Sequence, residues 1–468
     1  MRAPNDAGEM TLRTTPLDRR RFLQTSVGLA GFSLPAFLAL RSALPRGTVG
    51  PARARSCIVL FCWGGVSQLD TWDPKPEAPD KVRGEFRPIA TATPGIHISE
   101  HLPRLARQTE KLAIVRSMHH ENSGHGKAMY WNMTGHPPPQ PGAAVNLPPS
   151  VNDWPSLGAV VSKFRRAPKG LPPAVRLPYP LVDNNTLQAG EYGGWLGMEY
   201  DPIVVSTRSG TPFGGVSRGL GAASIDPTLT TEEGRLKRRL SLLRGLETPI
   251  GGGPATEGFD HFRGMAVDML QNARVQEAFD LEKEPRRVHE AYGDHICGKS
   301  MLLARRLVAA GVPIATVVCA AGDLNGAKGD HWDTHGDNFN RLRNTMLPAL
   351  DRSAAALLDD LSERGMLEET LVVFLTEFGR TPQINDNAGR DHFPSCYSVA
   401  LAGGGVRGGQ VHGRSNSIAS EPASGACGPA DLHATIFEAL GIPPHTEIHD
   451  RLGRPFPIAD GKPLPLFS

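Results

Sequence analysis

The sequence predicts an α/β fold in which a doubly wound, mostly parallel sheet is sandwiched by helices. Three observations support this prediction. Short, continuously apolar segments alternate with longer amphipathic segments of helical period. Strands that are apolar throughout are typical of parallel sheets covered on both faces. Polar clusters follow several of the apolar segments, where open α/β sheets form their ligand sites.

The elements follow one another in a regular order. The predicted strands are apolar runs, several of them ended by glycines, at 56–62, 112–116, 312–319, 370–376 and 396–405. The predicted helices lie between them, before the strand at 112, at 124–135, near 155–165, at 257–282, 290–310, 338–367 and 430–442. Residues of about 136–255 are rich in proline, glycine and loops, so we expect a loop-rich insertion within one domain spanning 55–468.

The N-terminus predicts an export signal. Paired arginines at 19–21 precede Phe22 and Leu23, and an apolar run of about 16 residues follows. This pattern is typical of a twin-arginine signal spanning 1–54, with a small-x-small cleavage site at 52–54. A retained membrane anchor is the alternative, although the run is short for a bilayer span. We therefore expect a periplasmic or extracellular protein without a membrane span in its mature chain.

The composition argues against one class of function, nucleic-acid binding. The formal charge of the 468 residues is only +2 and aromatic residues are 6%, so nothing indicates a nucleic-acid-binding protein. The six cysteines show no C-x-x-C spacing, and four of them lie in or beside apolar strands, where buried free thiols are expected.

Four of the predicted loops carry polar clusters. They contain Ser67, Asp70 and Asp73; His119, His120, Ser123 and His125; Asp330, His331, Asp333, His335 and Asp337; and Glu377, Arg380, Asp391 and His392. Because the carboxyl ends of parallel strands share one edge of a sheet, we expect these clusters to meet in space.

The cluster at 331–335 has the spacing of a metal site. His331, Asp333 and His335 alternate, so in an extended segment their side chains share one face. Imidazole with carboxylate suits Zn, Mn or Fe, whereas oxygen ligands alone suit Ca or Mg. Asp, His, Asn and Gly are also turn formers, so a solvated loop is the alternative. The convergence of four loops favours a divalent metal.

The other loops offer further ligands. We predict Asp70, Glu377 and His392 as metal ligands; a turn acid, a strand-end ion pair and a backbone-bonded loop histidine are their respective alternatives. Arg380 could bind an anionic substrate through a forked contact or pair with Glu377. Asp391 is expected to orient His392 or a neighbour.

Ser123 and His125 raise the question of a nucleophile. A serine beside a histidine can form a hydrolytic pair. The segment NSGHG is also compatible with a polar turn before a helix. Ser123, His125 and Arg380 are therefore the candidate catalytic residues.

The order of the motifs GGVSQLDTWDPKP, HHENSGHGKAMYWNMTGHPP, WDTHGDN, TEFGRTP and GRDHF resembles the domain of unknown function 1501 family. That family is similar to the alkaline phosphatase and sulfatase superfamily, and the resemblance covers about 55–465. It implies an alkaline-phosphatase-like α/β sandwich with a metal site at the carboxyl ends of its strands.

The resemblance assigns ligand positions. Asp70 matches the first metal-binding Asp, and Asp333 with His335 match the pair from a middle loop. Glu377 takes the place of the Asp after a later strand, and His392 matches the final His.

The departures from the superfamily pattern concern the nucleophile and one metal site. Counting back from the MTG turn reaches His125, where a sulfatase has its modified Cys. Phe378 stands where a further His ligand is expected. A C-x-[PA]-x-R motif is absent from the sequence, which argues against a formylglycine sulfatase.

The sequence therefore predicts an exported metal-binding protein that hydrolyses phosphate or sulfate esters of an anionic small molecule or glycan. The ion would be Zn, Mn, Fe or Ca, and a metal-bound water could attack directly. The alternative is a non-catalytic binding protein with a degenerate site, which holds an anionic glycan or docks an exported partner.

Overall fold

The computed structural model describes residues 52–138, 147–183, 186–205, 272–319 and 331–467, with the short pieces 212–213, 216–217, 264–265 and 268–269. Residues 1–51 of the predicted signal and Asp330 lie outside the described residues. The predicted cleavage segment is packed against the fold, because the backbone amides of Arg53 and Ala54 both donate to the carbonyl of Ala439 at 2.9 and 2.8 Å.

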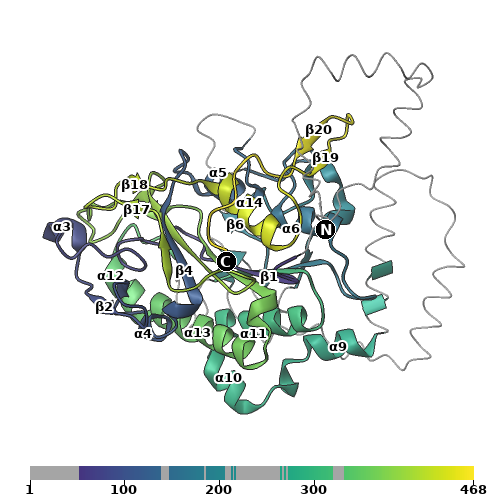
Figure 1. Ribbon diagram of the computed structural model, residues 1–468, viewed down its shortest axis with the longest axis horizontal. Helices are drawn as coiled ribbons and strands as arrows, with labels where there is room; N and C mark the ends of the chain where they lie inside the picture. The colour runs from purple at the N-terminus through teal and green to yellow at the C-terminus, as the bar shows by residue number, and fades with distance from the viewer. Residues whose placement is uncertain are drawn as a thin grey trace, which may run out of the picture. The chain divides into compact units, whose positions relative to one another are not determined.

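A central sheet organises the part of the chain that the structure describes (Figure 1). Its eight strands run in the order β16 (Gln410–His412), β4 (Leu112–Met118), β15 (Tyr397–Ala402), β12 (Thr370–Leu375), β1 (Ser56–Phe61), β11 (Ile314–Val318), β5 (Ala174–Leu177) and β8 (Ile203–Val204). All neighbours pair in parallel except β15, which is antiparallel to both β4 and β12. The predicted mostly parallel α/β sheet is confirmed.

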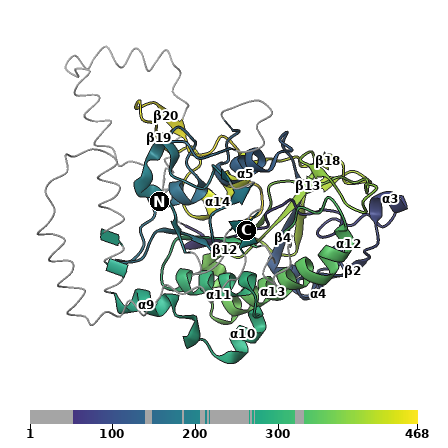
Figure 2. The same ribbon diagram turned by 180° about the vertical axis from the view of Figure 1, so that it is seen from behind.

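Helices cover both faces of this sheet. One face carries α4 (Pro103–Ala106), α9 (Ala273–Phe279), α10 (Arg286–Tyr292), α11 (Ile296–Ala309) and α13 (Leu347–Glu363). The other face carries α5 (His125–Thr134), α6 (Leu157–Phe164) and α14 (Pro429–Ala439), as both views show (Figure 2).

Strand β1 shows why both faces need a cover. Ile58 and Leu60 belong to the apolar cluster beneath α11 and α13, whereas Val59 and Phe61 belong to the cluster beneath α5 and α14. All four are fully buried. A strand with two apolar faces is stable only when helices remove both from water.

Two predicted helices are divided in the structure. The segment predicted at 290–310 is broken at Gly293, which has φ +90°, a backbone region that favours glycine. The segment predicted at 338–367 is helical but contains a π turn, η7 (Leu342–Met346), between α12 (Asn338–Arg341) and α13. Pro348 in the first turn of α13 lacks the N–H that an α-helix requires, which explains the altered hydrogen bonding before it.

The remaining elements are short. Two-stranded ribbons are formed by β2 (Pro88–Ala90) with β3 (His97–Ser99), β6 (Val182–Asp183) with β7 (Thr186–Leu187), β9 (Pro212–Phe213) with β10 (Val216–Ser217), β13 (Gly379–Arg380) with β14 (His392–Phe393), β17 (Arg414–Ser415) with β18 (Pro422–Ser424), and β19 (Glu447–His449) with β20 (Pro455–Pro457). Short helical turns are α3 (Asp80–Arg83), η1 (Thr109–Lys111), η2 (Gly194–Leu196), η3 (Met198–Tyr200), η5 (Leu281–Lys283) and η8 (Leu367–Glu369). Strands β5 and β8 lie within 136–255, so this segment contributes to the central sheet.

Across the ranges described, none of the helices has both the length and the apolarity needed to cross a bilayer.

Several histidines are buried in the neutral form, and this makes the fold sensitive to acid. Burial lowers the pKa of His433 to about 4, and its Nε2–H donates to the carbonyl of Asn132 at 2.8 Å. The pKa of an unfolded His is about 6.5, so the unfolded chain binds more protons as the pH falls from about 6.5 to about 4. Stability is therefore lost across that window.

We expect His433→Gln to reduce this acid sensitivity. Between pH 7.5 and pH 5 the variant should lose about 2 kcal/mol less unfolding free energy than the wild type, because one proton-linked group is removed. Urea denaturation at both pH values measures the difference. His449→Gln, at an exposed position, is the matched control and should behave like the wild type. Equal pH dependence of the wild type and His433→Gln would contradict the expectation.

Candidate metal centre

The site is built where β1 ends in two glycines. Gly64 has φ +118°, and a Cβ there would lie 2.3 Å from the backbone nitrogen of Asp333. Glycine therefore allows the 332–333 backbone to approach the end of β1. The backbone N–H of Gly64 donates to Glu377 Oε1 at 2.7 Å, which joins the ends of β1 and β12.

The Asp333 carboxylate is the centre of a histidine cluster. The Nε2 atoms of His392 and His335 lie 3.0 and 3.1 Å from Asp333 Oδ1. The Nε2 atom of His125 lies 3.4 Å from Asp333 Oδ2. Ligand atoms of His125, Asp333 and His392 all lie within 4.8 Å of one another, which fits a single ion.

Each of the three rings is oriented through its other nitrogen. Nδ1 of His125 donates to Glu377 Oε1 at 2.8 Å, and Nδ1 of His335 donates to Asp391 Oδ1 at 2.7 Å. Nδ1 of His392 donates to the carbonyl of Ser123 at 2.7 Å. Carboxylate and carbonyl oxygens only accept, so Nδ1 carries a proton in each ring and Nε2 is the atom directed at the cluster. This is the outer-contact pattern of metal-binding histidines.

The short distance between two histidine nitrogens bears on whether a cation fits among them. The Nε2 atoms of His335 and His392 are 2.9 Å apart. Two lone pairs at this distance repel each other unless a proton or a cation is shared between them. Ligand atoms around a tetrahedral zinc ion with bonds of about 2.0–2.2 Å are about 3.3 Å apart, close to the spacings seen here. The donor set therefore fits a divalent transition metal.

The electrostatics also favour positive charge at this point. Burial opposes a charge on His125, but the hydrogen bonds that its ring donates to the Asp333 and Glu377 carboxylates, with their negative charge, outweigh it and raise the pKa of His125 to about 9. Burial would raise the pKa of Asp333, yet His125, His392 and Arg380 hold it well below its usual range. A proton and a metal ion compete for the same Nε2 lone pair, so metal affinity should rise with pH.

The Arg380 guanidinium holds the Asp333 carboxylate in place. Its guanidinium is fully buried and donates to Asp333 Oδ1 at 2.5 Å, to the carbonyl of Gly65 at 3.0 Å and to that of Trp332 at 3.2 Å. It also donates to the carbonyl of Gly64. The predicted contact between Arg380 and a substrate anion is replaced by these internal bonds.

Glu377 stands behind His125. Its carboxylate is fully buried and accepts from Gly64 and His125, and its backbone carbonyl accepts from His120 Nε2 at 2.6 Å and from Asn132 Nδ2 at 2.8 Å. Glu377, which the sequence analysis predicts as a metal ligand, thus holds the ring of His125. No local signal in the sequence identifies His120 and Asn132 as supports of this turn.

Asp70 has another partner. Its carboxylate accepts from Arg390 Nε at 2.8 Å and Nη2 at 3.2 Å, from Ser67 Oγ at 2.6 Å and from Asn338 Nδ2 at 3.0 Å. Asp70 and Arg390 are both fully buried. The structure therefore gives the predicted ligand Asp70 a buried ion pair with Arg390 of the GRDHF motif.

Ser123, Asp391 and His331, which are also predicted site residues, lie around the histidine cluster. The exposed Ser123 supplies its backbone carbonyl to His392. Asp391 orients His335, where His392 was one of the expected partners. His331 lies beside the cluster and its Nδ1 accepts from the backbone N–H of Asp333 at 3.2 Å.

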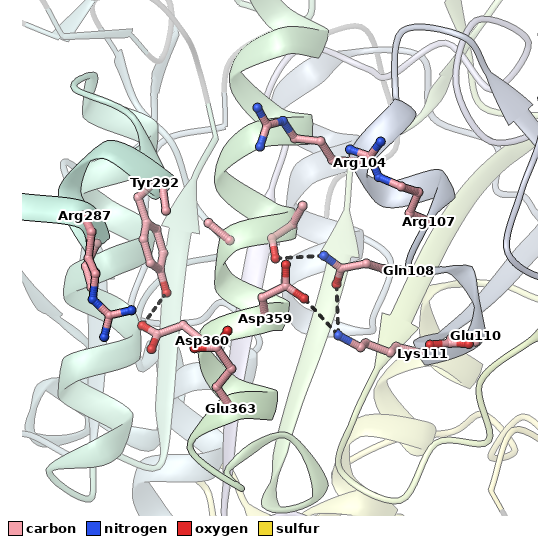
Figure 3. A pocket seen from close by; sticks show the side chains of 14 residues that line it. Arg104, Arg107, Gln108, Glu110, Lys111, Arg287, Tyr292, Asp359, Asp360 and Glu363 are labelled. Carbon is pink, nitrogen blue, oxygen red and sulfur yellow. Dashed lines mark hydrogen bonds and ion pairs between the residues drawn. The ribbon is translucent and has the colours of Figure 1, made fainter.

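A separate cavity lies among the helices of the other layer (Figure 3). It has a volume of about 540 Å³ and is lined by residues of α4, η1, α10 and α13. Two contacts join side chains of its lining: Lys111 Nζ lies 3.0 Å from Asp359 Oδ1, and the Tyr292 hydroxyl donates to Asp360 at 3.1 Å. None of the predicted site residues lines it.

Comparison with known protein families shows which family the chain belongs to. A family model described as protein of unknown function (DUF1501) matches residues 54–465. The chain belongs to this family. The resemblance recognised in the motifs is confirmed. Comparison with curated proteins finds no match.

The DUF1501 chain is also similar to solved structures at low identity. They include Ps i-CgsB in complex with k-i-k-neocarrahexaose, at 11% identity over 82% of this chain and 72% of that chain, with a TM-score of 0.38. PsFucS1 sulfatase from Pseudoalteromonas sp. has 13% identity over 86% and 70%, with a TM-score of 0.37. Phosphonate monoester hydrolase SpPMH from Silicibacter pomeroyi has 15% identity over 88% and 76%, with a TM-score of 0.35. Similarities this distant do not assign an activity.

The buried Asp70–Arg390 pair gives a stability prediction. Arg390→Met should lower the unfolding free energy by about 3–5 kcal/mol, because it leaves the Asp70 carboxylate buried without its counter-charge. Asp70→Asn combined with Arg390→Met should recover part of that loss. Urea denaturation of the wild type and both variants measures the effect. A wild-type denaturation midpoint for Arg390→Met would show that the pair does not hold this part of the fold.

Proposed function

We propose that this DUF1501 protein is a metal-dependent hydrolase of phosphate or sulfate esters. The observation that carries the proposal is the set of three histidine Nε2 atoms around one carboxylate, each ring held by an acceptor at Nδ1. His125, Asp333 and His392 would hold the ion, with His335 at the outer side. The resemblance of the motifs to the alkaline phosphatase and sulfatase superfamily supports an anionic ester as substrate.

A divalent transition metal supplies Lewis acidity and lowers the pKa of a coordinated water. The protein's own residues orient the groups that would hold the ion. Glu377, Ser123 and Asp391 fix the rings, and Arg380 fixes Asp333. His335 is about half exposed, so the open side of the cluster faces solvent at this residue. A solvent-facing coordination position distinguishes catalytic sites from closed structural ones.

The test combines metal content with hydrolysis. Mature chain without a polyhistidine tag is incubated with Zn, Mn, Fe or Ca, and bound metal is measured by plasma mass spectrometry. The wild type should hold transition metal, and Asp333→Ala and His392→Ala should lose it. Activity on p-nitrophenyl phosphate and sulfate should fall by more than about 100-fold in both variants, since removing even an outer partner typically costs 10–100-fold.

Asp386→Ala is the matched control. Asp386 is an exposed acid in the same loop as Asp391, so its loss changes the charge without touching the cluster. It should keep wild-type metal content and activity. A wild type that binds none of the four metals would overturn the proposal. Bound metal without hydrolysis of any ester would favour the binding-protein alternative.

We also propose that the chain is exported by the twin-arginine route. The paired arginines followed by Phe22, Leu23 and an apolar run support this proposal. Arg19→Lys combined with Arg20→Lys should retain the chain in the cytoplasm, as shown by cell fractionation and immunoblotting. Arg2→Lys, outside the motif, is the control. Unchanged export of the double variant would contradict the twin-arginine route.

A further inference from the structure

The cavity drawn in Figure 3 is large enough for a small organic molecule. Its volume of about 540 Å³ lies within the range of about 300–1,000 Å³ that is usual for small-molecule sites. It opens between α10 on one side and α4 with η1 on the other, and α13 lies between them. No residue of the histidine cluster or of its outer contacts lines it. A ligand held here would therefore occupy a site of its own.

Two arginines of the cavity lining lie on one side of a single helical turn. Arg104 is in α4 and Arg107 directly follows it, so their spacing of three residues places both side chains on the same face. The buried carboxylate of Asp351 on α13 fixes this turn, because it accepts from the backbone N–H groups of Arg104 and Leu105 at 3.0 and 2.8 Å. The backbone that carries both arginines is thus anchored beside the cavity.

The charges of the lining are separated along the cavity. Arg104 and Arg107 lie together at its upper end in Figure 3, and both side chains are exposed. No ion pair or hydrogen bond joins either guanidinium to another residue in the described part of the chain. The acids of the lining lie nearer the other end, where two of them already have cationic partners: Glu110, Asp359, Asp360 and Glu363. The upper end is therefore free to accept a negatively charged group.

The lining also indicates the chemistry of that group and of what is attached to it. A guanidinium presents N–H donors in a planar fork that matches the oxygens of a phosphate or sulfate group. An inorganic ion alone would fill only a small part of the cavity. Val288 of α10 and Ala355 and Ala356 of α13 offer apolar surface below the arginines. The acids at the far end would repel a second negative charge, so the lining favours one oxyanion joined to an uncharged organic body.

We propose that this cavity binds a small organic phosphate or sulfate monoester. Arg104 and Arg107 would hold the oxyanion, and Val288, Ala355 and Ala356 would contact the organic body. The phosphate and sulfate groups share the tetrahedral arrangement of oxygens that the two arginines would recognise. Because the metal centre contributes no residue to the lining, binding here does not depend on the proposed hydrolase activity.

Isothermal titration calorimetry of the full chain tests this site. The protein is treated with EDTA, so that an ester held by a metal ion at the histidine cluster does not contribute. The probes are phenyl phosphate, phenyl sulfate, inorganic phosphate and phenol. At least one of the esters should bind with a stoichiometry of one, and about 10-fold more tightly than inorganic phosphate, because its ring is removed from water. Phenol, which lacks the oxyanion, should not bind.

Variants assign the binding to the cavity. Arg104→Gln and Arg107→Gln should each weaken ester binding by about 10-fold or more, because each removes charge-assisted hydrogen bonds. Both side chains are exposed, so the variants should fold, and an unchanged Tm checks this. Arg286→Gln is the matched control, since Arg286 is an exposed arginine of α10 that pairs with Glu290 and does not line the cavity. It should bind as the wild type does.

Three results would overturn the proposal. One is the absence of binding by both esters. Another is ester binding no tighter than that of inorganic phosphate, which would exclude an organic ligand. The third is wild-type affinity in either arginine variant, including ester binding that appears only after a metal ion is added, because that binding would belong to the histidine cluster.

Discussion

The position of the Asp333 carboxylate is the constraint on which the rest of the site depends. The buried guanidinium of Arg380 holds this carboxylate and, through backbone carbonyls, holds the turn after β1 as well. Gly64 lets the two backbones approach closely enough for that arrangement. A charge pair in such a buried place is costly unless its remaining donors are satisfied, and here most of them are. The three imidazoles therefore surround a carboxylate whose position the Arg380 contacts and the backbone determine.

The outer contacts make the arrangement stiff. Glu377 has its side chain between Gly64 and His125, while its carbonyl is held by His120 and Asn132. Asn132 in turn accepts from the hydroxyl of Tyr397 at 2.9 Å. These contacts restrict the His125 ring, and in known metal sites outer partners of this kind raise the metal affinity. The elements α5, β12 and β15 thus act together on one imidazole.

The sequence predicted the sheet because apolar periodicity is a local signal. It also predicted that polar residues after strands would converge, and Asp333, His335 and His392 do converge. The sequence does not show which side chain each of these acids contacts. Asp70 and Asp333 are both acids after apolar strands, yet one meets Arg390 and the other meets histidines. That choice depends on contacts across hundreds of residues, such as the 320-residue separation of Asp70 and Arg390, which no local pattern records.

The reversed direction of β15 has a consequence for how the chain can vary. Tyr397, the first residue of β15, pairs with Met118, the last residue of β4. A residue just before β15 therefore lies at the same edge as residues just after β4, β1 and β12. His392 reaches the cluster by this route, from a hairpin excursion between β12 and β15 and not from a crossover helix. Insertions in a crossover can be absorbed at the surface, whereas any change in the length of 376–396 would move His392 directly. In related chains, the length of this excursion should vary less than that of the other connections.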